Sequence, residues 1–320
     1  MGDVRYIIYP ERNIQQDKAW KSIEVGLEAR SFFYDYNTDY GFQDRYVKWA
    51  PRVKLHLRPG PLSQYRHHFG YRFVSVHQFY GRGLDIVEGT WEREQRNYYV
   101  NEFNYQLENR SPLLPSTTEL LIQQGNGFLR LSAEHEHKFN YRKFDKGVYL
   151  RLFGGWLPYY DEPDAYVPFL FNGTTSVGFF SKDFLYDEYL FGRNEAEGVL
   201  SQQVFLRDAQ LKTLYQGGIS DTWMTSVGAA ADIPGPVPFQ LYIDAAVYDD
   251  PFDEGVTFSY SAGVAIIAWK DAVEIYIPLL ESSDIRNNSI YEERSFLQRI
   301  SFLFDLNEIA PRKIKDVYFD

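Results

Sequence analysis

The sequence contains one short cluster that could bind a metal ion, His135-Glu136-His137. On an extended strand the two histidines would share a face about 6–7 Å apart, a spacing that a metal ion can bridge. That face is the apolar one of the segment 129–141, and Glu136 points to the opposite face. The zinc-protease motif HExxH does not occur in the chain. We therefore expect interfacial histidines and no metal site.

The sequence holds no recognisable catalytic constellation. It contains no cysteine, which excludes a thiolate metal site, cysteine catalysis and a disulfide scaffold. The nucleophile motif G-x-S-x-G is absent, and no serine is tied by spacing to His135 or His137, which disfavours a lipase. We expect a protein that is not an enzyme and that binds no cofactor.

Charged side chains recur on one face of the first four long segments. They are Glu24, Glu28, Arg52, Lys54, Arg58, Arg66, Arg72, Glu102 and Glu108. Opposite charges on neighbouring strands can pair across a sheet face. Such a charge ladder could line a pore that selects solutes, or it could neutralise itself inside a filled barrel.

A second candidate site is Phe191-Gly192-Arg193, near the end of a long connection between strands. A Gly-Arg tip can fold back into a barrel and place its guanidinium against carboxylates of the lumen. The candidates for those carboxylates are Asp244 and Glu274. The alternative is an ordinary turn with a solvated arginine, which local spacing alone favours.

The elements that would position these residues follow a period of two. From Val47 to Leu57 the odd positions are apolar, and the even positions are mostly Lys, Arg or His. The same alternation runs through 23–33, 65–79, 99–108 and 129–141. It predicts β-strands with one apolar and one polar face, two to three times longer than the ~5–6 residues usual in soluble sheets.

Alternation alone does not separate a membrane barrel from a soluble sandwich. Strand length, long charged rows and aromatic residues crowded near strand ends, such as Phe32, Phe33, Tyr98 and Tyr99, favour the membrane. A strand that crosses a bilayer needs ~9–11 residues. We therefore predict an all-β fold, a transmembrane antiparallel up-and-down barrel. A soluble carbohydrate-binding β protein is the alternative.

The pattern predicts about twelve strands, an even number as in ordinary bacterial barrels. They are 23–33, 47–58, 65–79, 99–108, 117–125, 128–140, 147–157, 219–232, 239–249, 258–268, 272–281 and 295–306. A strand pair from 167–171 or 199–206 would raise the number to fourteen, although 199–211 could equally form an amphipathic helix. A barrel of this size is only slightly wider than the ~8-stranded type that side chains fill, so we favour a filled interior.

The expected organisation places most of the chain in one barrel. Residues 1–20 would be a periplasmic lead-in, 21–306 the barrel, and 307–320 a periplasmic tail. Within the barrel, 158–218 would be a long extracellular loop region that folds toward the lumen. No secretory signal is visible at the start of the chain.

Composition limits the partners. The 320 residues carry 33 Lys+Arg and 44 Asp+Glu, a formal net charge of −11, which argues against nucleic acid. Aromatic residues make up 18% of the chain, too many for a disordered protein. We expect contact with lipid or lipopolysaccharide of a bacterial outer membrane, and a periplasmic or outer-membrane protein as partner.

Three segments, Tyr34–Val53, Phe144–Leu157 and Asp187–Gly198, resemble one family. It is the C-terminal outer-membrane barrel that follows a gluzincin-aminopeptidase-like region in large proteins of Bacteroidota. The resemblance covers most of the chain and implies an outer-membrane location in a Gram-negative bacterium. Because the peptidase zinc motif is absent from this chain, it implies no enzymatic activity here.

The last third is distantly similar to the outer-membrane assembly-factor superfamily, also called surface antigens. There an Arg-Gly loop tip enters the barrel and five strands follow. Here Phe191-Gly192-Arg193 stands in that place, followed by five strands that include Leu241–Asp250 and Tyr260–Ile267. The order differs, since Gly192 precedes Arg193 and Asn194 follows it. The resemblance implies that Arg193 holds the loop in the lumen.

These observations predict an integral outer-membrane barrel that serves as a membrane anchor or scaffold for a periplasmic or complex-bound partner. A solute channel is the first alternative and would show ion conductance. A pore for protein assembly or translocation is the second, and it would have a weak seam between the first and last strands.

Overall fold

The structure is a computed structural model. It describes residues 2–8, 20–37, 42–60, 63–85, 90–141, 146–161, 169–176, 183–188, 191, 198–215, 217–251, 255–287 and 295–309. Within these ranges the side chains of 2, 20–21, 33–37, 42–44, 80–85, 90–94 and 175–176 are not described.

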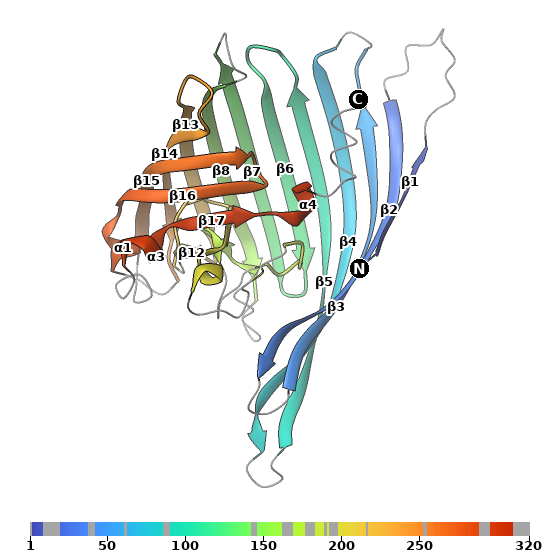
Figure 1. Ribbon diagram of the computed structural model, residues 1–320. Helices are drawn as coiled ribbons and strands as arrows, with labels where there is room; N and C mark the ends of the chain where they lie inside the picture. Colours follow the sequence, from blue (N-terminus) through green and yellow to red (C-terminus); the bar gives the residue numbers. More distant parts are fainter. Residues whose placement is uncertain are drawn as a thin grey trace. The chain divides into compact units, whose positions relative to one another are not determined.

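The prediction of an all-β antiparallel chain is confirmed, because thirteen strands form one sheet in the order β1-β2-β3-β4-β5-β6-β7-β8-β13-β14-β15-β16-β17 (Figure 1). The first eight are β1 (Gly2–Ile8), β2 (Trp20–Asn37), β3 (Phe42–Leu57), β4 (Tyr65–Asp85), β5 (Thr90–Asn109), β6 (Ser116–Gly125), β7 (Phe128–Asn140) and β8 (Gly147–Tyr160). The last five are β13 (Trp223–Asp232), β14 (Phe239–Asp249), β15 (Val256–Trp269), β16 (Val273–Glu281) and β17 (Ser301–Phe304). The order begins at β1 and ends at β17, so a closed barrel is proposed below and is not part of the observed fold.

The strand count differs from the expected twelve at the start of the chain. Gly2–Ile8, placed in a lead-in by the sequence, is the strand β1 and pairs with β2 from Gly2↔Ala29 to Ile8↔Ile23. The physical reason is that this short segment also alternates, with Val4, Tyr6 and Ile8 on one face.

The end of the sheet also differs from the expected strand 295–306. Phe296–Arg299 forms the short helix α3, and only Ser301–Phe304 pairs as β17. Ser295 and Gln298 have the arrangement of a capping box, in which Gln298 Oε1 accepts the backbone N–H of Ser295 at 2.8 Å, and this favours a helix. The other short helices are α1 (Ser283–Arg286) and α4 (Leu306–Ile309). Among the described residues, no helix has both the length and the apolar character needed to cross a membrane.

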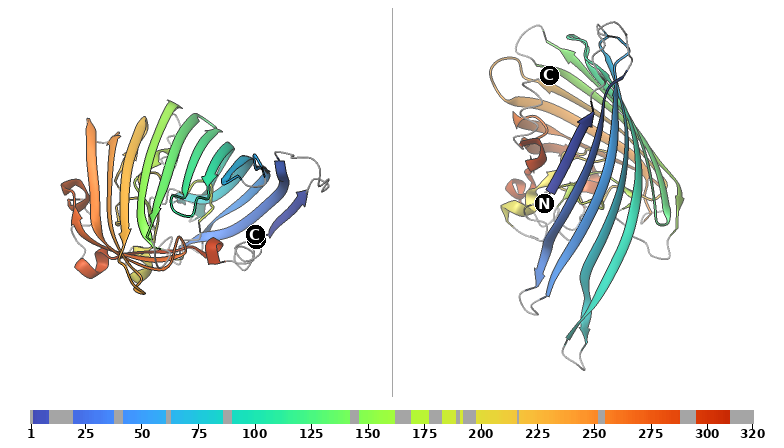
Figure 2. Two further views of the ribbon diagram at one scale, coloured as in Figure 1. Left: turned by 90° about the horizontal axis from the view of Figure 1, so that it is seen from above. Right: turned by 90° about the vertical axis from the view of Figure 1, so that its right-hand side faces the viewer.

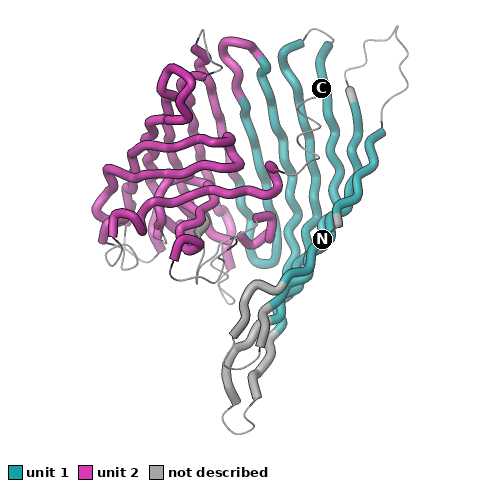
Figure 3. Tube along the Cα trace, in the orientation of Figure 1, with its two compact units in different colours: residues 1–110, 117–131 teal, residues 111–116, 132–320 magenta. Residues whose placement is uncertain are grey.

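Contacts divide the chain into two units, which are described separately (Figure 3). Unit 1 comprises 1–110 and 117–131, and unit 2 comprises 111–116 and 132–320. In unit 1 the strands β2 to β5 have 16 to 21 residues and run side by side (Figure 2). This length confirms the long strands that the alternation predicts.

Unit 2 contains the connection between β8 and β13, residues 161–222, which we call the insert. Its described elements are β9 (Phe171–Asn172), β10 (Thr175–Ser176), η2 (Val199–Gln202), β11 (Val204–Phe205) and β12 (Ile219–Ser220). The strands pair as β9–β12 and β10–β11 in two-stranded sheets, and Gln203, next to β11, forms an isolated bridge with Phe302 of β17. The alternative of fourteen strands in the main sheet is therefore wrong for the described residues, because these pairs are too short to extend it.

Burial in both units is the reverse of that in a soluble protein. Side chains alternate between a buried face, which carries most of the charged residues, and an exposed face, which carries large apolar residues. Exposed apolar residues include Val25, Leu27, Trp49, Phe69, Phe103, Leu120, Leu150, Leu152, Trp156, Val227, Leu241, Ile243, Phe258 and Ile275. Buried polar residues include Glu28, Arg30, Lys48, Gln78, Gln123, Arg130, Arg151, Ser226, Asp244, Ser259, Ser261, Glu274 and Glu281.

Candidate functional site

The candidate site is the buried face of the unit 2 sheet together with the insert that lies on it. The strands β8, β13, β14, β15 and β16 supply this face. Polar side chains of the face contact the insert at successive points from β8 to β16. The insert is therefore docked by specific polar contacts as well as by apolar packing.

An ion pair stands at the centre of the site. Lys212 Nζ of the insert donates to both carboxylate oxygens of Asp244 on β14, each at 3.0 Å. The hydroxyl of Tyr242 donates to the backbone carbonyl of Lys212 at 3.0 Å. Gly228 on β13 faces Asp244, and a Cβ there would lie 2.7 Å from Asp244 Oδ1. The missing side chain at Gly228 thus makes room for the ion pair.

A network of hydroxyl groups follows the ion pair along the insert. Tyr215 Oη lies 3.1 Å from Tyr248 Oη and donates to Asp284 Oδ2 at 3.0 Å. Ser259 Oγ lies 2.9 Å from Tyr248 Oη, and the Ser259 hydroxyl also donates a hydrogen bond to Asp284. Burial, with the neighbouring Tyr248 and Asp284, raises the pKa of Tyr215 far above its ordinary value.

Thr213 adds a further polar contact between the same parts. Its hydroxyl donates to Glu281 at the end of β16. At the other side of the face, Arg151 on β8 donates to the backbone carbonyl of Asp208 at 2.7 Å and to Ser226 Oγ at 3.1 Å. Hydrogen bonds to charged groups are each worth about 1.5–3 kcal/mol when buried. These contacts give the insert a single position on the sheet.

Apolar contacts complete the docking. Phe171 of β9 is fully buried, and its ring lies so close to Gly155 of β8 that a Cβ at Gly155 would overlap it. A second cluster joins the insert to β14, β15, β16 and β17. Its members are Val204, Phe205, Leu214, Tyr242, Ala265, Tyr276 and Leu303.

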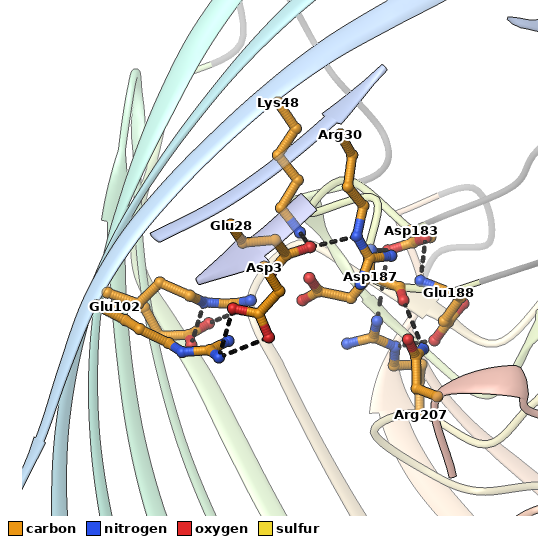
Figure 4. A network of polar contacts seen from close by, with 12 residues as sticks. Asp3, Glu28, Arg30, Lys48, Glu102, Asp183, Asp187, Glu188 and Arg207 are labelled. Carbon is orange, nitrogen blue, oxygen red and sulfur yellow. Dashed lines mark hydrogen bonds and ion pairs between the residues drawn. The ribbon is translucent and has the colours of Figure 1, made fainter. Parts of the chain in front are cut away.

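The first part of the insert has its own ionic cluster around Arg207 (Figure 4). Arg207 pairs with Glu188 and, at 3.5 Å, with Asp183. Asp183 also accepts the backbone N–H groups of Asp187 and Glu188, at 3.1 and 2.9 Å. Although burial opposes the charged form, the carboxylates of Glu188, Asp183 and Asp187 hold the pKa of Arg207 above its ordinary value. This cluster stabilises the fold of the insert itself.

The structure brings together only part of the loop lock expected from the sequence. Gly192 and Arg193 lie outside the described residues. Asp244 does lie on the buried face, but its described cation is Lys212. Glu274 also lies there and accepts from Tyr276 Oη at 2.7 Å and from the backbone N–H of Asp271 at 2.6 Å, and both of these partners are local.

Sequence reasoning missed Lys212. A lysine inside a long connection gives no periodic signal, and its partner lies on a strand that is 32 residues away. The available signal was the charge of Asp244, which stands between apolar neighbours on a face expected to be inside. A buried carboxylate needs a cation or several donors.

The charge ladder of unit 1 lies on the buried face of β2 to β5. Arg72 donates to both carboxylate oxygens of Glu102, at 3.0 and 3.1 Å. Glu28 lies with Arg30 and Lys48, which the sequence ladder did not include (Figure 4). Both of these carboxylates are thus matched by cations on the same face.

Two further carboxylates of the ladder, Glu24 and Glu108, also lie near arginine side chains. Arg52 Nη2 lies 3.1 Å from Asp3 of β1, and its Nε lies 3.7 Å from Glu24. Glu108 lies opposite Arg66 in the β4–β5 register and pairs with Arg110 at 3.0 Å.

Two cations of the ladder behave differently from the rest. Arg58 donates to the backbone carbonyl of Ser63 at 3.3 Å, in the turn after β3. Lys54 is exposed, and its register partners are Glu24 on β2 and Gly70 on β4. Sequence reasoning missed Asp3 because it lies on the strand β1 that was expected to be a lead-in.

The histidine cluster considered for a metal ion is a pair of neighbouring rings that are tilted relative to each other. The rings of His135 and His137 have centroids 6.1 Å apart, and His137 packs on Phe139 at 4.5 Å. Across the described residues, no group of three or more His, Asp or Glu side chains has the arrangement of a metal site.

Comparisons with known proteins give only distant likeness, and only among solved structures. No family model matches the chain, and no curated protein matches it. Among solved structures, the chain is similar to CdiB from Acinetobacter baumannii, with a TM-score of 0.36 and 11% sequence identity. The match covers 83% of this chain and 45% of that one, so the chain spans less than half the length of this neighbour. The family resemblances seen in the sequence remain predictions.

Proposed function

We propose that the chain is an integral outer-membrane β-barrel that anchors a periplasmic or membrane-bound protein partner, with the insert folded inside it. The observation that carries the proposal is the reversed burial of the strands. On β14, Ile243 is 54% exposed and the next residue, Asp244, is 2% exposed. A sheet of this kind needs an apolar solvent on one side.

Exposed and half-buried apolar residues form a band across neighbouring strands in unit 2. In register, Leu152 of β8 lies opposite Val227 of β13, and Leu241 of β14 lies opposite Val264 of β15. Ile266 and Ile275 continue the band to β16. Soluble monomers rarely expose an apolar patch larger than ~300–600 Å². The band therefore supports contact with lipid over the alternative of a soluble carbohydrate-binding protein.

The insert favours an anchor over an open channel. It covers the buried face of the unit 2 sheet and is fixed there by Lys212–Asp244, Thr213–Glu281 and the Tyr215 network. Most charges of the ladder in unit 1 are paired on their own face. A barrel built in this way has little free lumen, which supports a scaffold that conducts poorly.

A solute channel is the second candidate, and one observation favours it. Lys54 is an exposed cation on the charged face of unit 1, as in a pore that attracts anions. No contact among the described residues specifically favours an assembly or translocation role.

Electrophoresis of the chain refolded in detergent tests the proposal. A closed barrel resists SDS in the cold and changes its mobility after boiling, whereas a protein that stays soluble in plain buffer and shows no shift contradicts it. Planar-bilayer recording then separates the two candidates. The anchor predicts no steady conductance, and the channel predicts open-state current with anion preference that Lys54→Gln reduces.

A further inference from the structure

We infer that His56 and His68 of unit 1 form a binding site for one divalent transition-metal ion such as Zn²⁺, Ni²⁺ or Cu²⁺. The two residues face each other directly in the register of β3 and β4. The site is distinct from the insert and lies within unit 1. The inference does not depend on the solvent of the exposed face or on the proposed function.

The geometry of the two rings identifies the binding atoms. His56 Nδ1 lies 2.6 Å from His68 Nδ1, with the ring centroids 4.8 Å apart and the planes at 74°. Flipping either ring would bring a carbon to that position, far inside the ~3.5–4.0 Å of a normal carbon contact. The two nitrogens therefore face each other, and the choice of ring orientation does not change this result.

A carboxylate lies near the Nε2 atom of each ring. His56 Nε2 lies 4.0 Å from Glu24 Oε2, and His68 Nε2 lies 3.5 Å from Glu108 Oε1. A histidine that binds a metal usually gives its other ring N–H to a carboxylate, carbonyl or water, so carboxylates on the Nε2 side fit binding through Nδ1. In the metal-free protein one Nδ1 carries a proton and donates it to the other at 2.6 Å, and a metal ion that displaces this proton would bind both nitrogens.

A metal ion fits the remaining chemistry of the site. Imidazole nitrogen suits Zn²⁺, Ni²⁺ and Cu²⁺. A tetrahedral ion with Zn–N bonds of ~2.0–2.1 Å holds two nitrogens about 3.3 Å apart, so the rings need to separate by less than ~1 Å. The side chains of His56 and His68 are 28% and 18% exposed, which leaves access for the ion and for water ligands.

Equilibrium dialysis of the full, untagged chain in detergent micelles against Zn²⁺ tests the inference. We expect wild type to bind one equivalent that His56→Gln and His68→Gln each lose. The matched control His135→Gln/His137→Gln removes the other close pair and should keep that equivalent. Glu24→Gln and Glu108→Gln should weaken binding by about 10–100-fold, as expected for groups that orient a ligand.

Two results would overturn the inference. One is equal Zn²⁺ binding by wild type and the His56→Gln/His68→Gln variant. The other is no binding by wild type, which would leave only a shared proton between the rings. If the variants fail to fold, as judged by their cold-SDS mobility, Cu²⁺ paramagnetic resonance of the folded His135→Gln/His137→Gln protein decides. It should show two imidazole nitrogens on copper, and a spectrum without them contradicts the site.

Discussion

Lys212 Nζ lies 3.0 Å from both carboxylate oxygens of Asp244, at a position on β14 where Asp244 is almost completely buried. This pair joins the insert to the sheet of unit 2. Since both side chains are largely withdrawn from water, each depends on the other for charge compensation. The pair is therefore one of the contacts that hold the insert on the sheet.

Removing one member of this pair should release the insert. Asp244→Asn leaves Lys212 buried without its anion, and removing one partner of a buried pair costs about 3–5 kcal/mol. We expect faster proteolytic cleavage within 198–220 and a lower denaturant midpoint. The double variant Lys212→Met/Asp244→Leu should lose less than the single Asp244→Asn. If Asp244→Asn is cleaved as slowly as wild type, the pair does not hold the insert.

Neighbouring glycines on β8 provide a matched test of docking. A side chain at Gly155 overlaps the ring of Phe171, whereas a Cβ at Gly154 meets no atom within 4 Å. Gly155→Ala should destabilise the folded state by about 1–3 kcal/mol through overpacking. Gly154→Ala should be neutral or stabilising by under ~1 kcal/mol. Denaturant unfolding in micelles measures both, and equal effects would contradict the docking of Phe171 on β8.

Alkaline pH should loosen the insert through Tyr215. Its pKa is raised by burial and by Tyr248 and Asp284, so the folded state keeps a proton that the unfolded chain loses above its ordinary value of 10.0. The contribution of Tyr215 to the stability of the folded state is complete below pH 10 and decreases as the pH rises beyond it. Proteolysis of the insert should therefore accelerate above pH 10. Tyr215→Phe should remove part of this dependence, and an unchanged pH profile in that variant would count against it.

Arginine substitutions on the exposed face should reveal how deep each substituted side chain lies in the lipid bilayer. Ile243→Arg should cost about 2–4 kcal/mol if the side chain lies near the bilayer centre, and Val256→Arg near a strand end only ~0–1 kcal/mol. Both residues are more than half exposed, so a water-facing sheet would accept both substitutions alike. Unfolding free energies of the two variants in lipid vesicles give the comparison.

The alternation of residues was sufficient to predict the long strands and which side chains share a face. This pattern is local, because successive side chains of a strand point to opposite faces whatever the strand pairs with. It correctly placed Leu27 and Glu28 on opposite faces, one exposed and the other buried. It also predicted most strand boundaries where tight turns such as 125–127 mark them.

Features that depend on pairing between distant segments were not predictable in this way. The pairing of Asp3 with Arg52 requires β1 to join the sheet, and the partner of Asp244 lies in an aperiodic connection. At Ser295 a capping box favours a helical turn where the alternation predicts the start of a strand. His56 and His68 face each other only because the turn after β3 sets the register, which alternation does not specify.

The most direct test of the central claim uses the absence of cysteine from the chain. Single cysteines at Leu150, Arg151, Leu152 and Phe153 of β8 can each carry a nitroxide label in the protein reconstituted into vesicles. The account predicts collisions with oxygen, which is concentrated in lipid, at Leu150 and Leu152, and much lower accessibility at Arg151 and Phe153. Collisions dominated by a water-soluble nickel chelate at Leu150 and Leu152 would show that the apolar face meets water, and would contradict the membrane barrel.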